Sequence, residues 1–198
     1  HTKEDGVQKE NLVSQVIVAK HQNQNFEAYV IVAACHLKAD TPTKDCTETR
    51  VRQARQIMDV VEQKRQNLIT QFGVSQDNIV TLVCGDFNDI PDTPSVHEFM
   101  KNKEIDFKSA FEDEPYTLFQ KYGSGDKIYK STVDHVLYSK NLTITKKVSP
   151  PKDELVEETG LVSDKFPSDH LSLFAEFSLL ENENSFKTWN SFIKYYPL

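Results

Sequence analysis

The chain is poor in the features that mark membrane-spanning, disulfide-stapled and zinc-binding proteins. Its 198 residues contain no apolar run near the roughly 18 residues that a membrane-crossing helix needs. Cysteines number only 3, and no Cys-x-x-Cys pair occurs, which argues against a disulfide framework or a zinc site. Cys35 and Cys84 lie in strand-like runs and are interpreted as small buried hydrophobes. We therefore expect a reducing compartment, the cytoplasm, with the mitochondrion as the alternative.

Basic residues are also scarce. The chain has 23 Lys and Arg against 30 Asp and Glu, a net charge of −7, which argues against a general nucleic-acid-coating surface. A phosphate-bearing substrate is still compatible with this charge, because a local metal ion or basic cluster can outweigh the global sign. Hydrophobic residues make up 38%, including 12 Phe and 7 Tyr, which is sufficient for the core of one domain.

Strand-like and helical patterns alternate along the chain. The order predicts a mixed α/β sheet whose first two strands form an antiparallel hairpin, joined to the third strand by a long crossover helix. We expect residues 1–12 to be a polar leader and residues 181–198 an aromatic tail that packs as a helix or covers a sheet edge. The expected strands are Val13–Ala19, Phe26–Cys35, Ile79–Cys84, Ser131–Ser139, Thr143–Val148 and Leu171–Leu179.

The best helical pattern covers Thr47–Phe72, with Thr47 as a plausible N-cap and Gly73 as the stop. A second, shorter helix begins at Thr93-Pro94. One face of the long helix carries Val51, Ala54, Met58, Val61, Leu68 and Phe72, and we expect it to be buried. We expect the opposite face to be solvated; it carries Arg50, Arg52, Arg55, Glu62, Lys64 and Arg65.

Polar residues gather at the ends of predicted strands. Gly85-Asp86-Phe87-Asn88 ends one apolar run, His36-Leu37-Lys38 ends another, and Ser168-Asp169-His170 precedes a third. Active sites of α/β proteins lie at such strand ends. Carboxylate and amide oxygens suit Mg²⁺, and a histidine beside an aspartate can stay charged and contact a phosphate. Any one of these residues alone is more often a turn or surface residue, so the indication of phosphoester chemistry depends on their joint occurrence.

Four ordered motifs resemble those of the endonuclease/exonuclease/phosphatase superfamily, and within it the nocturnin-type members of the deadenylase-like branch. The motifs are His36-Leu37-Lys38-Ala39, Gly85-Asp86-Phe87-Asn88, Asp134-His135-Val136-Leu137-Tyr138-Ser139 and Pro167-Ser168-Asp169-His170-Leu171. The resemblance covers roughly residues 14–177. It implies a four-layer α/β/β/α sandwich with mixed, largely antiparallel sheets, of which residues 13–180 would form the carboxyl-terminal half.

The resemblance also implies residue roles in a Mg²⁺-dependent hydrolase, with Mn²⁺ as an alternative metal. Asp86 would activate the attacking water and, with Asp169, lie at the metal. Asn88 and His36 would bind the phosphate, His170 would contact it while oriented by Asp169, and Asp134 would support this network. Lys38 and Lys130 are candidate substrate contacts, and solvated surface lysines are an equally good interpretation of both.

Two positions depart from the nocturnin pattern. Asp40 and Lys130 stand where nocturnin-type members usually carry an Arg that binds the extra phosphate of NADP(H). The replacement of these arginines argues against the use of NADP(H). The resemblance as a whole implies an RNA 3′ end or a nucleotide cofactor as the substrate.

The resemblance covers only one half of the superfamily's domain. The family's principal metal-binding Glu belongs to the amino-terminal half, and neither Glu4 nor Glu10 ends a strand-like run. We expect the chain alone to be inactive, with another chain or the missing half covering its sheet. The alternatives are a non-catalytic binding or scaffold module, and a phosphatase or sphingomyelinase-like member of the same superfamily.

Overall fold

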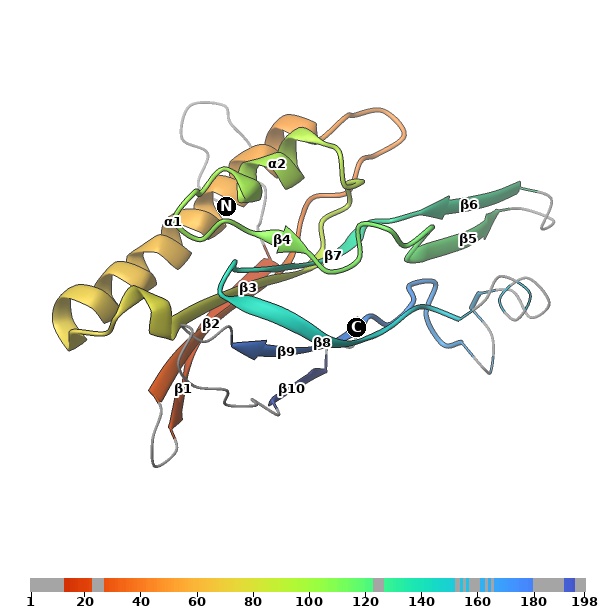
Figure 1. The fold of residues 1–198 in the computed structure, drawn as a ribbon. Coiled ribbons are helices and arrows are strands. Elements are labelled where there is room, and N and C mark those ends of the chain that lie inside the picture. Colours follow the sequence, from red (N-terminus) through yellow and green to blue (C-terminus); the bar gives the residue numbers. More distant parts are fainter. Residues whose placement is uncertain are drawn as a thin grey trace, which may run out of the picture.

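A computed structural model describes residues 13–22, 27–122, 127–151, 166–179 and 191–194, with a few single positions between 151 and 166. The described part contains a five-stranded sheet, a three-stranded sheet, a separate two-stranded hairpin, one long helix, one short helix and one 3-10 turn (Figure 1). The elements are β1 Val13–Gln22, β2 Glu27–His36, α1 Thr47–Phe72, η1 Gln76–Asn78, β3 Ile79–Asp86, α2 Pro94–Met100, β4 Lys108–Ser109, β5 Leu118–Tyr122, β6 Lys127–Ser131, β7 Asp134–Tyr138, β8 Leu142–Val148, β9 Phe174–Leu179 and β10 Ser191–Lys194.

The larger sheet has the strand order β1-β2-β3-β7-β4. The predicted hairpin is confirmed, because β1 pairs antiparallel with β2. The predicted crossover is also confirmed, because β2 and β3 are parallel neighbours and α1 lies between them in sequence. The pairs β3–β7 and β4–β7 are antiparallel, so the sheet is mixed and largely antiparallel as expected.

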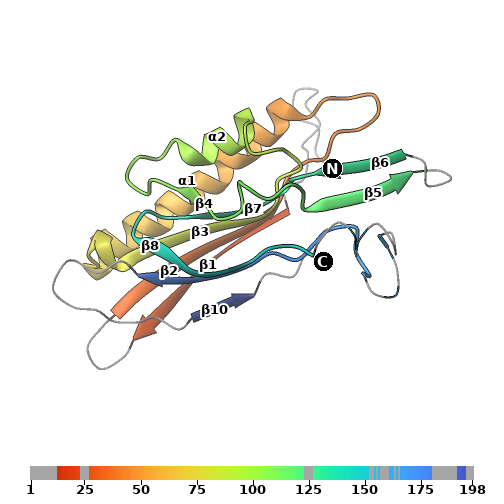
Figure 2. The same cartoon turned by 45° about the vertical axis from the view of Figure 1, so that its right-hand side comes forward.

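Helices cover one face of this sheet and a second sheet covers part of the other (Figure 2). The second sheet has the order β10-β9-β8. Its inner residues pack against those of β2, β3 and β7 in one apolar cluster, which includes Val30, Leu82, Leu142, Leu173 and Phe177. From the sequence alone, we expect another chain or the missing half of the domain to cover this face. The structure shows that β9 covers part of it from within the chain.

Some of the sheet remains uncovered in the described structure. Ile17 of β1 is 48% exposed and Val13 is 65% exposed, so the edge strand β1 has no layer over its inner face. The described residues form three layers, one of helices and two of sheet, and the fourth layer of the sandwich stays a prediction. No helix among the described residues is both long and apolar enough to cross a membrane.

Helix α1 has the predicted bounds, but its buried stripe differs from the predicted one. Gly73 ends the helix in the left-handed conformation, with φ 65°, as expected, whereas the N-cap position is Cys46 and Thr47 is already helical. Phe72, which was predicted to be buried, is 69% exposed. The predicted solvated face was wrong at Arg50 and Arg65, which are each 3% exposed. These two arginines belong to a stripe at intervals of three and four that contains Arg50, Ala54, Ile57, Val61, Arg65 and Leu68.

Three other elements differ from the sequence prediction. The predicted strand Ser131–Ser139 is broken at positions 132 and 133, because β6 pairs with β5 in a separate hairpin while β7 joins the large sheet. The β5–β6 hairpin itself was not predicted. The last main strand begins at Phe174 rather than Leu171. Within the predicted aromatic tail, residues 191–194 form the edge strand β10 beside β9. The remaining tail residues lie outside the described part.

Gly85 allows β2 and β3 to approach closely just before the polar strand ends. It has φ +143°, and a Cβ at this position would lie 1.8 Å from the Cys35 carbonyl oxygen. Cys35 and Gly85 are partners in the parallel register, so the clash would involve backbone that no rotamer change can move. Only glycine therefore fits this pairing.

We expect Gly85→Ala to destabilise the full-length protein by about 3 kcal/mol or more, because the pair must separate locally. Gly73→Ala is the matched control, since its Cβ meets nothing within 4 Å and incurs only the left-handed strain, about 1–2 kcal/mol. Urea unfolding of both variants measures the difference. Equal destabilisation would contradict the role of the close approach.

Candidate active site

The carboxyl ends of the parallel strands β2 and β3 place two polar side chains side by side. His36 and Asp86 are register partners, and the Leu37 N–H donates to the Asp86 carbonyl oxygen at 2.9 Å. His36 Nε2 lies 3.4 Å from Asp86 Oδ2, and its side chain is 59% exposed while that of Asp86 is 14% exposed. The geometry therefore presents a largely buried carboxylate beside an accessible imidazole.

Asp86 is at the centre of the cluster. Its Oδ1 accepts the Asn88 backbone N–H at 2.7 Å, and its Oδ2 lies 3.9 Å from His170 Nε2. Burial raises the pKa of the Asp86 carboxyl above its ordinary value, and the nearby charge of Asp134 adds to this rise against the Asn88 hydrogen bond. A carboxylate with a raised pKa between two imidazoles is suited to exchanging a proton with a bound water.

Asn88 has a constrained conformation. Its φ is 49°, in the left-handed region that asparagine tolerates better than most residues. Its Nδ2 donates to the Leu37 carbonyl oxygen at 2.9 Å and lies 3.3 Å from Asp86 Oδ2. The amide is thus fixed by the β2 loop, which leaves its oxygen with a defined direction.

His170 is held by Asp134 rather than by Asp169. Its Nδ1 is 2.8 Å from Asp134 Oδ2, and Asp134 is 1% exposed. Asp169 instead accepts from Gln120 Nε2 at 2.7 Å, so the expected orienting role of Asp169 was wrong. The hydrogen bond to Asp134 raises the pKa of His170, and the charges of Asp134, Asp86 and Asp169 add to this rise against the effect of burial. The imidazole is therefore favoured in its charged form.

Neighbouring residues of β7 serve opposite faces of the sheet. His135, the residue after Asp134, stacks on Phe87 with ring centroids 4.7 Å apart, and its Nε2 lies 2.8 Å from the Asp89 carbonyl oxygen. Burial lowers the pKa of His135. The alternation of a strand explains why only Asp134 of this motif reaches the polar cluster.

The β5–β6 hairpin fixes the segment that carries His170. The Phe119 N–H donates to the Asp169 carbonyl oxygen at 2.9 Å, and the Leu171 N–H donates to that of Thr117 at 2.7 Å. Thr117 Oγ1 also accepts the backbone N–H of Asp134 at 3.0 Å. Thr117 therefore positions both partners of the His170–Asp134 pair, a role that its sequence neighbourhood did not indicate.

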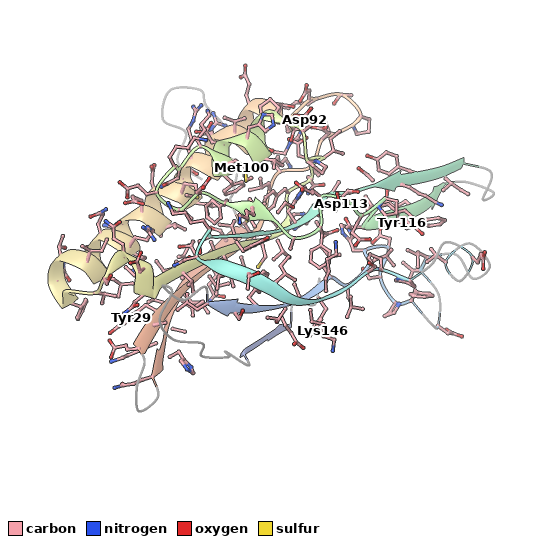
Figure 3. The ribbon with its side chains drawn as sticks, in the orientation of Figure 1. Tyr29, Asp92, Met100, Asp113, Tyr116 and Lys146 are labelled. Atoms are coloured by element: carbon pink, nitrogen blue, oxygen red, sulfur yellow. The ribbon has the colours of Figure 1, made fainter. Side chains whose placement is uncertain are left out.

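Of the predicted substrate-binding lysines, Lys130 lies over aromatic rings. Its Nζ is 4.8 Å from the Tyr116 ring centroid and 5.1 Å from that of Phe119. Figure 3 shows Tyr116 beside the β5–β6 hairpin. The interpretation of Lys130 as a solvated surface lysine is therefore not supported, and its role as a substrate contact stays a prediction.

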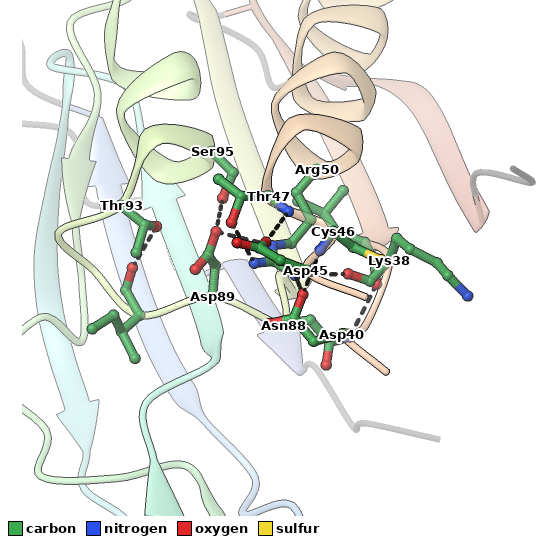
Figure 4. Close-up of polar contacts among 12 residues, drawn as sticks. Lys38, Asp40, Asp45, Cys46, Thr47, Arg50, Asn88, Asp89, Thr93 and Ser95 are labelled. Atoms are coloured by element: carbon green, nitrogen blue, oxygen red, sulfur yellow. Dashed lines mark hydrogen bonds and ion pairs between the residues drawn. The ribbon is translucent and has the colours of Figure 1, made fainter. Parts of the chain in front are cut away.

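Arg50 ties together the loops that follow β2 and β3 (Figure 4). Its guanidinium donates to Asp89 Oδ2 at 3.0 Å, to Asp40 Oδ1 at 2.7 Å and to the Lys38 carbonyl oxygen at 3.1 Å. Asp89 Oδ2 in turn accepts from Ser95 Oγ of α2 at 2.7 Å. The hydrogen bond from Arg50 lowers the pKa of Asp40. Arg50 and Asp89 were not predicted as site residues, although the three-and-four spacing of the helix stripe would have placed Arg50 in the core.

The structure thus brings His36, Asp86, Asn88, Asp134 and His170 together. It does not bring the side chains of Asp169 and Lys38 into the same hydrogen-bonded cluster. The Lys38 backbone is held by Gln53 Oε1, which accepts its N–H at 2.9 Å, and in Figure 4 its side chain extends away from the Arg50 network. The catalytic and binding roles of all these residues stay predictions.

The donor set fits a hard divalent cation in kind but is incomplete in the described part. Asp86 and Asp134 face each other across β3 and β7, and Asp134 Oδ1 is buried with no hydrogen-bond partner. Carboxylate oxygens are the ligands that Mg²⁺ and Mn²⁺ prefer. Within the described residues, however, no group of three or more His, Cys, Asp or Glu side chains could hold a metal ion. Asp169, a predicted ligand, is already hydrogen-bonded to Gln120.

Residues 17–170 match the model of the "Endonuclease/Exonuclease/phosphatase family". The chain belongs to this family. Mouse nocturnin is 32% identical over 178 residues, which cover 85% of the chain and 37% of nocturnin. The Ccr4 exoribonuclease subunit of the CCR4-Not complex from Schizosaccharomyces pombe is 26% identical and matches 84% of the chain. The chain spans little more than a third of the length of its curated nocturnin relatives, 37–38%.

Solved structures of the family share the fold. The human nocturnin catalytic domain with bound sulfate superposes with a TM-score of 0.57 and 25% identity, covering 86% of the chain and 54% of that domain. ANGEL2, a 2′,3′-cyclic phosphatase in complex with adenosine-2′,3′-vanadate, gives a TM-score of 0.60 at 16% identity, covering 86% of the chain and 62% of ANGEL2. The predicted family and the mixed α/β fold are therefore confirmed.

Asp134→Asn should lower the pKa of His170 toward its ordinary value, because the amide cannot supply the negative charge that stabilises the imidazolium. An NMR titration of the metal-free, full-length protein measures it. Asp169→Asn is the control, and we expect a smaller fall because Asp169 acts only through its charge. An equal or larger fall in the control would contradict the assignment of Asp134 as the partner of His170.

Proposed function

We propose that the full-length protein is a Mg²⁺-dependent phosphohydrolase of the nocturnin/deadenylase type. It would cleave phosphodiester or phosphate ester bonds in RNA 3′ ends or in a nucleotide cofactor. One observation carries the proposal: the largely buried carboxylate of Asp86 lies between the Nε2 atoms of His36, at 3.4 Å, and His170, at 3.9 Å. Membership in a family of nucleases and phosphatases supports it.

The site residues divide the work of hydrolysis as follows. Asp86 accepts a proton from the attacking water, for which its raised pKa suits it. His170, held charged by Asp134, donates a hydrogen bond to a non-bridging phosphate oxygen and stabilises the charge that develops there. His36 contacts the phosphate from the opposite side. Asn88, whose amide is fixed by the Leu37 carbonyl, positions the phosphate and the water.

A bound divalent cation would neutralise charge on the phosphate group as a Lewis acid. Asp86 is the best placed of the described residues to help hold it, and further ligands would come from outside the described part. We propose that the amino-terminal half of the fold supplies them and covers the exposed inner side of β1, where Ile17 is 48% exposed. Burying such a face would contribute roughly 25 cal/mol per Å².

Two observations support the choice of substrate: the activities named for the relatives, and the ion pair between Asp40 and Arg50. Ccr4 is a 3′-5′-exoribonuclease, and ANGEL2 acts on a 2′,3′-cyclic phosphate. Asp40 stands where nocturnin-type members usually carry an Arg, and its carboxylate is paired with Arg50 at 2.7 Å while 55% exposed. A carboxylate at this position repels an additional terminal phosphate, which favours an RNA 3′ end over NADP(H).

We also propose that the protein works in a reducing compartment, the cytoplasm. All three cysteines are free and buried, and the pKa of the Cys84 thiol is raised to about 11 by burial. Such thiols are inert small hydrophobes rather than disulfide partners or nucleophiles.

Asp86→Asn should lower the turnover of poly(A) RNA by the full-length protein with Mg²⁺ at least ~10²-fold, because the amide cannot accept the proton. Asp92→Asn is the control, since its side chain is 93% exposed beside α2 (Figure 3). The assay is initial-rate release of nucleotides. Near-wild-type turnover in Asp86→Asn would remove Asp86 from the mechanism. A wild-type protein inactive on every substrate would favour the binding-module alternative.

The double substitution Asp40→Arg with Lys130→Arg restores arginine at the two positions that differ from the nocturnin-type pattern. It should raise NADPH hydrolysis relative to poly(A) hydrolysis. Arginine offers a planar fork to a terminal phosphate that aspartate repels. Asp40→Asn is the necessary control, because it also removes the pair with Arg50 but adds no cation. A wild-type preference for NADPH over poly(A) would overturn the role assigned to Asp40.

A further inference from the structure

We propose a second ligand site, for a small phosphomonoester such as a sugar phosphate or a nucleoside monophosphate, at the end of the large sheet opposite the candidate active site. The proposal is independent of the proposed function. A polar pocket of about 360 Å³ lies there, within the size range of small-molecule sites. Arg65 of α1, residues 76 and 77 of η1, residues 103–105 and residues 139–141 line it.

Arg65 carries the proposal because its guanidinium is buried with one ion pair and no hydrogen bond to a described residue. Its side chain is 4% exposed, and its Nε is buried with no hydrogen-bond partner. It forms an ion pair with Glu62 Oε2 at 3.6 Å, a separation too long for a hydrogen bond. The Glu62 oxygens already accept from Gln66 at 2.8 Å and Asn102 at 3.3 Å.

Arg50, the other arginine of the same helix stripe, has a guanidinium whose donors are well supplied with hydrogen-bond acceptors. Arg50 donates to two carboxylates, one backbone carbonyl and Thr47 Oγ1. Arg65 belongs to the same stripe and is as deeply buried, yet no described residue accepts from it. Arg65 thus has one ion pair, with Glu62, and a buried Nε that lacks a hydrogen-bond acceptor. A buried donor without an acceptor is unfavourable, so the pocket that Arg65 lines suits a polar occupant, an anion or ordered water.

The other lining residues favour a phosphate ester over water. Lys103 and Lys140 are exposed lysines on the pocket wall, so together with Arg65 they place three cations on one concave surface. Three cations suit a dianionic group with three oxygens, and the guanidinium fork suits two of them. The acidic side chains of Asp77 and Glu104 also line the pocket and can accept from hydroxyl groups of the ligand.

The wall of the pocket is preorganised. Asn141 Nδ2 donates to the carbonyl oxygens of Asp77 and Ile79, at 3.2 and 3.0 Å, and Ser139 Oγ donates to Asn141 Oδ1 at 2.7 Å. These bonds join the end of β7 to the start of β3. Ligand binding therefore requires no ordering of this wall, which favours affinity.

The pocket is distinct from the candidate active site. Arg65 lies roughly four turns along α1 from Arg50, about 22 Å at 1.5 Å per residue. Ile79 begins β3, whereas Asp86 ends it. A substrate phosphate held by His36 and His170 cannot reach Arg65, so the second site takes its own ligand.

Isothermal titration calorimetry tests the proposal, with the full-length, metal-free protein titrated with ribose 5-phosphate and, separately, with AMP. Unphosphorylated ribose is the ligand control. We expect binding of the phosphate esters and none of ribose. Arg65→Lys should weaken binding at least ~10-fold, because the fork is lost although the charge stays. Lys140→Ala should also weaken it, and as an exposed residue it leaves the fold intact.

Lys108→Ala is the matched control, since Lys108 is an exposed lysine of β4 that does not line the pocket. Unchanged binding in this variant, with loss in Lys140→Ala, would support the site. Two outcomes would overturn it. One is the absence of binding to the wild type, which would leave water as the occupant. The other is equal affinity in wild type, Lys140→Ala and Arg65→Lys, which would place the phosphate elsewhere.

Discussion

The close backbone approach of β2 and β3 at Gly85 is the constraint on which the candidate site depends. Because Gly85 has no Cβ, the Cys35 carbonyl can lie where a side chain would otherwise be. The parallel pairing of β2 with β3 then extends one residue further along each strand, which makes His36 the neighbour of Asp86. A wider pairing would separate the imidazole from the carboxylate before any other site residue was involved.

Helix α1 connects this strand pair to both ends of the molecule through one stripe. The apolar part of the stripe, from Ala54 to Val61, lies on the sheet and contributes to the core. The two arginines of this stripe differ in their surroundings. Arg50 donates hydrogen bonds to several acceptors and fixes the loops of the candidate site, whereas Arg65 lines a polar pocket. A buried arginine can thus act as a structural clamp or as a recognition group, and the number of acceptors around it distinguishes the two.

The strong local patterns predicted the fold well. The apolar run before Gly85, the long periodic segment of α1 and the glycine at its end each determine structure locally. The motif residues His36, Asp86, Asn88 and His170 were found because they end or precede such runs. The partner of His170 was predicted wrongly, because Asp169 is adjacent in sequence while Asp134 is adjacent in space. The roles of Thr117 and Arg50 were missed for the same reason: their contacts join segments distant in sequence, which no local pattern encodes.

The parallel pairing of β2 with β3 also has a consequence for how the chain folds. The contact between His36 and Asp86 closes a loop that contains the whole of α1. The pairing of Asp86 with Asp134 closes a loop of similar length, and the contact between Asp86 and His170 closes a longer one. Non-local contacts of this kind form slowly, because the entropy of loop closure is lost before the contacts can compensate it. Until they form, apolar strands such as β3 present unpaired edges to other chains. During synthesis, the interval before β7 pairs with β3 is therefore the time when aggregation competes with folding.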